Sequence, residues 1–180
     1  MAKLEIKLKI KRIKIGILGG SFDPAHKGHV AISKEALKKF NLESVIWAIT
    51  NQNPLKKKSK NNLKKRIDGC KKIIGFNKLI KVKFFENVIN SNKTADLINH
   101  LAKNNKYDLF FLMGADNLIN FHKWYKWRQI LKKSNIIVFD RHGYKKKSLN
   151  SKTYRSQDKE HITFVEFNKV NISSSQLRKI

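Results

Sequence analysis

The segment 19–29, GGSFDPAHKGH, constrains the fold more than any other part of the chain. It follows the apolar run 13–18 and leads into a helix-like run that ends at Phe40. Glycines between a strand and a helix let backbone N–H groups approach an anion, and the helix N-terminus adds partial positive charge there. His26 and His29 stand three residues apart at that helix start. The segment therefore predicts a turn that acts on the phosphates of a nucleotide.

Apolar strand patterns alternate with amphipathic helix patterns along the rest of the chain. Because such alternation indicates βαβ units, we expect an α/β fold with a Rossmann-like, doubly wound parallel sheet in a single domain. Residues 1–12 would form a basic N-terminal extension and residues 13–180 the domain. Strands are expected at 13–18, 44–49, 79–85, 109–113, 136–139 and 162–165, and helices at 29–40, 63–74, 94–103, 116–121, 124–132 and 171–178.

The segments that carry chemistry all fall where the strands of such a sheet end. Ligands of open α/β sheets bind outside the carboxyl ends of the strands. We therefore expect the chemical motifs to meet at one edge of the sheet. They are the segments 19–29, 50–57, 114–117, 140–143 and 171–178.

The chain is strongly basic, with 40 Lys and Arg residues against 13 acidic ones and a formal charge of +27. Such a charge attracts nucleic acid, acidic membranes and polyphosphates. The basic residues are spread along the whole chain rather than interleaved with aromatic residues in one stripe. This distribution favours a compositional bias over a specific nucleic-acid interface.

Several features of the sequence favour a cytoplasmic location. No apolar run reaches the length of a membrane span, so we expect no membrane association. The first residues, 1–14, alternate Lys with Leu or Ile and lack the apolar core of a secretory signal. Cys70 is the sole cysteine, which excludes an intrachain disulfide, and its place on an apolar helix face predicts a role in the core.

The paired histidines are the strongest candidates for catalysis. An imidazole can donate a hydrogen bond to a phosphate oxygen and stabilise charge that grows on a leaving group. The alternative is a purely structural role in capping the helix. No third residue stands at the spacing of a zinc site, so we expect no protein-bound metal.

Two further segments have the composition of phosphate or sugar sites. Serine hydroxyls at a helix start form an anion site, and an arginine one turn later can clamp a phosphate; alone, the same pattern fits a capped helix with a solvated arginine. Residues 173–175 are serines, followed by Arg178. Gly114 and Asp116 end an apolar strand, where Asp116 would bond sugar hydroxyls or cap the next helix.

The form GGSFDPxHxGH resembles the (H/T)xGH signature of the nucleotidyltransferase superfamily, and within it the bacterial nicotinate-nucleotide adenylyltransferases. The segment ISSSQLR resembles the second signature of that family, and the resemblance spans nearly the whole chain with its motifs in the family order. It implies transfer of an adenylyl group from ATP to nicotinate mononucleotide, which gives nicotinate adenine dinucleotide and pyrophosphate in NAD biosynthesis. Mg²⁺ would be bound mainly by the phosphates.

The resemblance also implies roles for individual residues. Trp124 would stack on the pyridine ring, whereas Trp127 is expected in the core. The implied catalytic residues are His26, His29 and Arg178. The implied contacts to ATP and its phosphates are Gly19, Gly20, Ser21, Phe22, Lys56, Arg141, Ser173, Ser174 and Ser175. The implied contacts to the nucleotide are Thr94, Gly114, Asp116 and Trp124.

Departures from the family pattern leave alternatives open. Leu97 replaces the second threonine of the family's Thr-x-x-Thr segment, so Thr94 alone is expected to serve there. Relatives continue for about another helix after the serine segment, whereas this sequence ends at Ile180, which implies a weakly held Arg178. A related enzyme that uses nicotinamide mononucleotide or phosphopantetheine, and a basic nucleic-acid-binding protein, stay open, as does assembly into a homo-oligomer.

Overall fold

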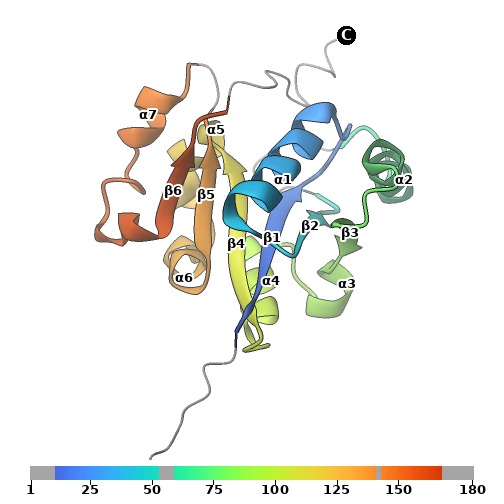
Figure 1. Ribbon diagram of the computed structural model, residues 1–180, viewed down its shortest axis with the longest axis horizontal. Coiled ribbons are helices and arrows are strands. Elements are labelled where there is room, and N and C mark those ends of the chain that lie inside the picture. The colour runs from blue at the N-terminus through green and yellow to red at the C-terminus, as the bar shows by residue number, and fades with distance from the viewer. Residues whose placement is uncertain (1–10, 53–58, 141–142, 168–180) are drawn as a thin grey trace, which may run out of the picture.

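A parallel sheet forms the centre of the molecule, as the computed structural model shows for residues 11–52, 59–140 and 143–167 (Figure 1). Each pair of neighbouring strands is parallel, and the sheet has the order β3-β2-β1-β4-β5-β6 in the described part of the chain. This order confirms the predicted Rossmann-like fold. The strands are β1 Ile13–Gly20, β2 Ser44–Ile49, β3 Ile80–Phe84, β4 Tyr107–Gly114, β5 Asn135–Phe139 and β6 Ile162–Val165.

Helices connect the strands, and most lie where the periodicity predicts them. The short elements α3, α7 and η2 were not predicted, because a single turn shows no helical period in the sequence. The predicted helix 124–132 begins only at Trp127, because Lys126 before it adopts a left-handed conformation with φ of 48°. The helices are α1 Lys27–Phe40, α2 Leu63–Ile74, α3 Glu86–Ile89, α4 Thr94–Ala102, α5 Ala115–Ile119, η1 Phe121–Lys123, α6 Trp127–Lys133, α7 Lys145–Leu149 and η2 Gln157–His161.

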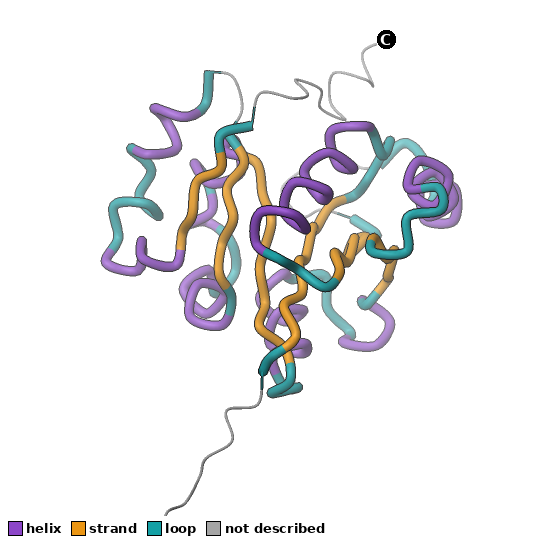
Figure 2. The backbone as a smooth tube through the Cα atoms, in the orientation of Figure 1, coloured by secondary structure: helices purple, strands orange, loops and turns teal. Residues whose placement is uncertain are grey.

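Both faces of the sheet are covered, which explains why β4 is apolar at consecutive positions. Leu109 and Phe111 pack in the cluster that contains residues of α4 and α6, whereas Phe110 and Leu112 pack in the cluster that contains residues of α1 and α2. Figure 2 shows the same two layers, with α1 in front of the strands and α4 behind them. The core is thus divided into two halves by the sheet.

The glycines of the segment 19–29 belong to a strand rather than to a turn, which corrects the expectation from the sequence. Gly19 and Gly20 pair with Ala48 and Ile49 of β2 as the last residues of β1. Pairing between β1 and β4 ends earlier, at Leu18. The two glycines therefore lie at the carboxyl end of β1, where the strand order reverses and where ligands of such sheets bind.

Candidate active site

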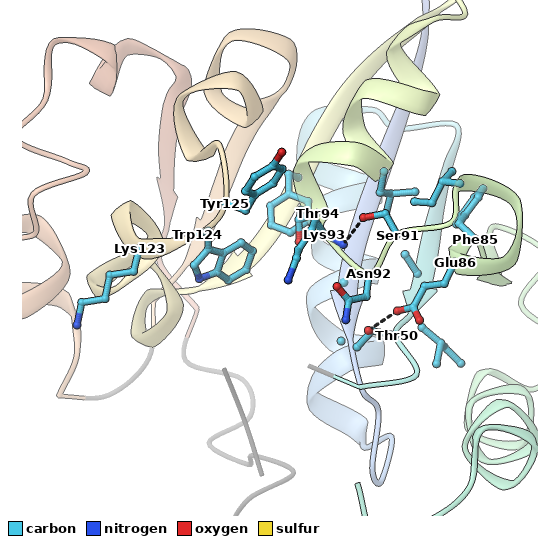
Figure 3. Close-up of a pocket in the computed structure, with 17 residues that line it drawn as sticks. Thr50, Phe85, Glu86, Ser91, Asn92, Lys93, Thr94, Lys123, Trp124 and Tyr125 are labelled. Carbon is cyan, nitrogen blue, oxygen red and sulfur yellow. Dashed lines mark hydrogen bonds between the residues drawn. The ribbon is translucent and has the colours of Figure 1, made fainter. Parts of the chain in front are cut away.

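A cavity of about 310 Å³ opens at the carboxyl ends of β1 and β2 (Figure 3). We call it the central cavity. Gly19 and Gly20 form part of its wall, and the absence of side chains there leaves room for a ligand. The other walls come from α3, from the start of α4 and from residues 123–125. Its size lies at the lower end of the range for small-molecule sites.

The turn that follows β1 is held in place by a buried aromatic ring. Residues 21–29, which we call the signature turn, contain Phe22 with a φ of 47° and an exposed fraction of 2%. Its ring stacks on Trp47 at 4.9 Å between centroids and lies 4.8 Å from the ring of His29. A left-handed conformation costs a non-glycine residue about 1 kcal/mol. Burial of the ring between two aromatic neighbours offsets that cost.

His26 and His29 pack against each other at the start of α1. His26 is the N-cap residue, and its backbone N–H donates to His29 Nδ1 at 3.2 Å. The ring centroids are 3.7 Å apart. Because Nδ1 of His29 accepts this bond, the proton of its neutral ring lies on Nε2. The histidines therefore do help to cap the helix, as the structural alternative predicts. Capping occupies Nδ1 of His29 and leaves Nε2, with its proton, for a phosphate.

A buried chain of hydrogen bonds supports His29 from behind. The backbone carbonyl of His29 accepts from Ser33 Oγ at 2.9 Å, and Ser33 Oγ accepts from Trp47 Nε1 at 2.8 Å. Ser33 and Trp47 are both fully buried. This chain ties the first turn of α1 to β2, so the orientation of the imidazole is set by the core.

Arg66 and Asp23 fasten the signature turn to the neighbouring loops. The guanidinium of Arg66, which is 3% exposed, donates to the carbonyls of Ser21 at 2.8 Å and Thr50 at 2.7 Å. It also donates to the carbonyls of Asn51 and Asn61. Four bonds to main-chain carbonyls occupy nearly all the donors of one guanidinium.

Asp23 makes the reciprocal connection from the turn itself. It is 1% exposed and accepts from the backbone N–H of Lys60 and from Nδ2 of Asn61, both at 2.6 Å. A buried carboxylate with charge-assisted bonds is a strong restraint. We call Asp23 and Arg66 together the buried clamp. Neither role could be predicted from the sequence, because the partners are main-chain atoms and one amide side chain that the fold brings together.

The wall of the central cavity also carries a carboxylate. Glu86 of α3 accepts from the Thr50 hydroxyl and from the backbone N–H of Asn51 at 3.1 Å. Figure 3 shows Glu86 and Thr50 joined on one side of the cavity. Glu86 was not among the predicted site residues, because it belongs to the unpredicted helix α3.

Trp124 lies on the other side of the cavity, as Figure 3 shows. Its indole is half-buried and meets the rings of Phe121 and Phe111 edge-on, at 5.1 and 6.1 Å between centroids. The ring therefore borders both the core and the cavity. Trp127 is buried in the core, as predicted.

The structure brings several predicted residues together. Gly19, Gly20, Thr94 and Trp124 line the central cavity. Ser21, Phe22, His26 and His29 lie in the adjoining signature turn. Their roles toward ligands stay predictions. The structure does not describe six residues of the predicted site: Lys56, Arg141, Ser173, Ser174, Ser175 and Arg178.

The end of β4 corrects one alternative. Gly114 is the N-cap residue of α5, and Asp116 lies in the first turn of that helix, so the capping interpretation of Asp116 was wrong. A Cβ atom at Gly114 would stand 2.5 Å from Asp116 Oδ1. Only a residue without a side chain leaves that carboxylate where it is, which explains the glycine.

The single cysteine belongs to the core, as its helix face predicts. Cys70 is fully buried on α2. Burial raises the pKa of its thiol to about 12, and the positive charge of Arg66 opposes this shift in part. The thiol is therefore protonated and unreactive at neutral pH.

Two features are absent from the part of the chain that the structure describes. Within residues 11–52, 59–140 and 143–167, no three His, Cys, Asp or Glu side chains gather as metal ligands. Among the helices described there, none combines the length and apolarity needed to cross a membrane.

Comparisons of the sequence with known proteins agree on one family. Residues 17–180 match the Cytidylyltransferase-like family. A protein of Pelagibacter ubique (strain HTCC1062), described as "Probable nicotinate-nucleotide adenylyltransferase", is 62% identical over 180 residues, which cover 100% of both chains. A protein of Ruegeria sp. (strain TM1040) with the same description is 39% identical over 130 residues, 72% of this chain and 68% of its own.

A solved structure supports the same fold. The Plasmodium falciparum nicotinic acid mononucleotide adenylyltransferase complexed with NaAD matches with a TM-score of 0.75 at 20% identity, over 93% of this chain and 83% of that chain. At this identity the likeness establishes the fold alone. The family itself rests on the sequence matches, which span the signature turn, the cavity walls and most of the sheet. The chain therefore belongs to the nicotinate-nucleotide adenylyltransferases, within the cytidylyltransferase-like family.

Proposed function

We propose that this adenylyltransferase binds nicotinate mononucleotide in the central cavity and the phosphates of ATP at the signature turn. The observation that carries the proposal is the position of Trp124 on the wall of a cavity that is also lined by Gly19 and Gly20, the two residues directly before the signature turn. A flat, cationic pyridine ring suits the face of an indole. A ring stacked there would direct the rest of the mononucleotide along the two glycines.

The reaction needs an acceptor phosphate and a leaving pyrophosphate. An oxygen of the 5′-phosphate of nicotinate mononucleotide attacks the α-phosphorus of ATP, and the bond from that phosphorus to the β-phosphate oxygen breaks. The second pKa of a phosphate monoester is about 6, so the attacking group is already anionic at neutral pH. The enzyme therefore needs no general base, and its tasks are positioning and charge neutralisation.

The signature turn supplies donors for the second task. His29, whose proton lies on Nε2, and His26 beside it would donate to phosphate oxygens and stabilise the charge on the departing pyrophosphate. Mg²⁺ enters with ATP, bound mainly by its phosphates. Arg178, Lys56, Arg141 and the serines 173–175 remain proposed phosphate contacts, as do Gly114 and Asp116 for the nucleotide. A cytoplasmic location also remains a prediction.

The test is pyrophosphate release from ATP and Mg²⁺ with three acceptors supplied separately. These are nicotinate mononucleotide, nicotinamide mononucleotide and phosphopantetheine. We expect fast release with nicotinate mononucleotide, together with formation of the dinucleotide. Release with phosphopantetheine alone, or with none of the three, would refute the proposal.

A further inference from the structure

We propose that Trp47 and Ser33 are positioning residues of the transfer reaction, which hold the imidazole of His29 in the orientation that meets the leaving pyrophosphate. The inference rests on the proposed function, because it requires that His29 contact the phosphates of ATP. Neither Trp47 nor Ser33 belongs to the predicted site or lines the central cavity. Both therefore act on the reaction through His29 alone.

Trp47 contacts both ends of the signature turn. Its indole stacks on Phe22 near the start of the turn, at 4.9 Å between centroids and 10° between the ring planes. It meets the ring of His29, the last residue of the turn, edge-on at 5.7 Å. Trp47 belongs to β2 and is fully buried, so the core fixes its ring. One side chain thus relates the two ends of the turn to the sheet.

The hydroxyl of Ser33 has a defined direction. A serine hydroxyl that donates to the carbonyl four residues earlier is common in helices and by itself indicates no function. Here Ser33 Oγ also accepts from Trp47 Nε1 at 2.8 Å, and an indole N–H can only donate. The hydrogen of the hydroxyl is therefore directed to the carbonyl of His29, at 2.9 Å. Through Ser33, the indole fixes the backbone that carries the imidazole.

Other contacts confine the imidazole of His29 as well. The rings of Phe22 and His26 lie 4.8 and 3.7 Å from it between centroids, and its Nδ1 accepts the backbone N–H of His26. With Nδ1 occupied, the proton on Nε2 is the group that can meet a phosphate oxygen. Such a donor stabilises the leaving group only if it is oriented before the reaction begins. A shift of the backbone at His29 should therefore lower turnover more than substrate affinity.

Ser134 provides the matched control, because it makes the same local bond elsewhere in the fold. Its Oγ donates to the carbonyl of Ile130, four residues earlier, at 2.7 Å, and the side chain is buried. Ser134 directly precedes β5, so it lies at the amino end of a strand, whereas the cavity opens at the carboxyl ends. Ser33→Ala and Ser134→Ala both remove a buried serine bond, but only the first breaks the link to His29.

The first experiment measures steady-state pyrophosphate release by full-length variants with ATP, Mg²⁺ and nicotinate mononucleotide. We expect Ser33→Ala to lower kcat about 10-fold, with a change of less than about 2-fold in KM for either substrate. In a His29→Ala background the same substitution should lower kcat by less than about 2-fold, because the residue through which it acts is absent. Ser134→Ala should leave kcat within about 2-fold of the wild type.

Trp47→Phe is the second variant, which removes the indole N–H and keeps an aromatic ring beside Phe22. It should lower kcat about 3- to 10-fold, and combining it with Ser33→Ala should add little, since both break the same chain. Ser33→Ala alone leaves a buried indole N–H without an acceptor. If that variant does not fold, Trp47→Phe carries the same test.

A second readout does not depend on activity. NMR spectra of protein labelled at the ring nitrogens of histidine distinguish the two neutral tautomers, and comparison with His29→Ala assigns the signal of His29. We expect the proton on Nε2 in the wild type and in Ser134→Ala. Ser33→Ala should give a mixture of tautomers, because the bond to Nδ1 is no longer held in place.

Four results would overturn the inference: an unchanged kcat in a folded Ser33→Ala protein, the same loss in Ser134→Ala, an equal loss with and without His29, or an unchanged His29 signal in Ser33→Ala. An equal loss with and without His29 would mark Ser33 as a structural residue. If the wild type releases no pyrophosphate, the proposed reaction fails, whereas the spectra still decide whether Trp47 and Ser33 orient the ring.

Discussion

The signature turn and the central cavity adjoin each other but are built in different ways. The turn is fixed by buried polar groups, since in the buried clamp Arg66 donates to four main-chain carbonyls and Asp23 accepts from one backbone N–H and one side-chain amide. The cavity wall is more open, because Asn92, Lys123 and Tyr125 are exposed. Its ring contacts are edge-on rather than hydrogen-bonded.

The difference follows from what each region has to do. Stabilising charge on a leaving group requires donors that are already oriented, because reorienting them during the reaction would cost part of the free energy by which they lower the barrier. Stacking on an aromatic ring tolerates small displacements, so the cavity does not need the same restraint. We therefore expect substitutions at the turn to affect turnover or folding, and those at the cavity to affect binding of the mononucleotide.

The largest effect is expected at His29. Replacing His29 with Ala removes the proposed donor to the leaving group and should lower kcat about 10²- to 10³-fold, with little change in KM for ATP. Steady-state pyrophosphate release measures both constants. His161→Ala, at a half-buried histidine paired with Glu160, is the control and should retain activity. Near-normal turnover in a folded His29→Ala protein would remove this residue from the mechanism.

The buried clamp is tested by Arg66→Met. The substitution leaves buried carbonyls without donors and should lower the free energy of unfolding by about 2 to 3 kcal/mol. Urea denaturation measures the loss. Lys64→Met changes an exposed residue of the same helix and should alter stability by less than about 0.5 kcal/mol. Equal stabilities of the two variants would show that the turn does not depend on the clamp.

A smaller effect is expected at the cavity. Trp124→Ala should raise KM for nicotinate mononucleotide about 10-fold through lost stacking, and leave KM for ATP nearly unchanged. Initial rates at varied concentrations of each substrate separate the two constants. Phe76→Ala, at a fully exposed aromatic residue, should change neither. A larger rise in KM for ATP than for the mononucleotide would show that Trp124 contacts ATP instead, against the proposal.

The smallest effect concerns Cys70, which lies one turn after Arg66 on α2. Because burial raises the pKa of its thiol from 9.0 to about 12, the folded protein holds almost no thiolate between pH 7 and 9. A thiol reagent should therefore label Cys70 only in urea. The same shift predicts that stability falls as pH rises above 9, where the unfolded thiol ionises first. Rapid labelling of the native protein would contradict the buried position.

Much of the fold could be predicted because the signals were local. Alternating apolar strands and amphipathic helices were enough for the parallel sheet, and Cys70 and Trp127 lie in the core as their patterns indicated. The errors have a common cause. Gly19 and Gly20 extend β1 because β2 pairs with them, and the left-handed Lys126 delays α6; neither depends on the period of the local sequence.

The sequence by itself determined the alternation of strands and helices, the family, and the residues that match its motifs. The tertiary structure alone decided that Arg66 reaches the carbonyls of Ser21, Thr50, Asn51 and Asn61. It also decided that Phe22 is strained but buried, and that Glu86 and Trp124 line one cavity. The reason is physical. Periodicity and motifs record bonds between near neighbours, whereas these contacts join main-chain atoms and side chains that only the packed sheet brings together.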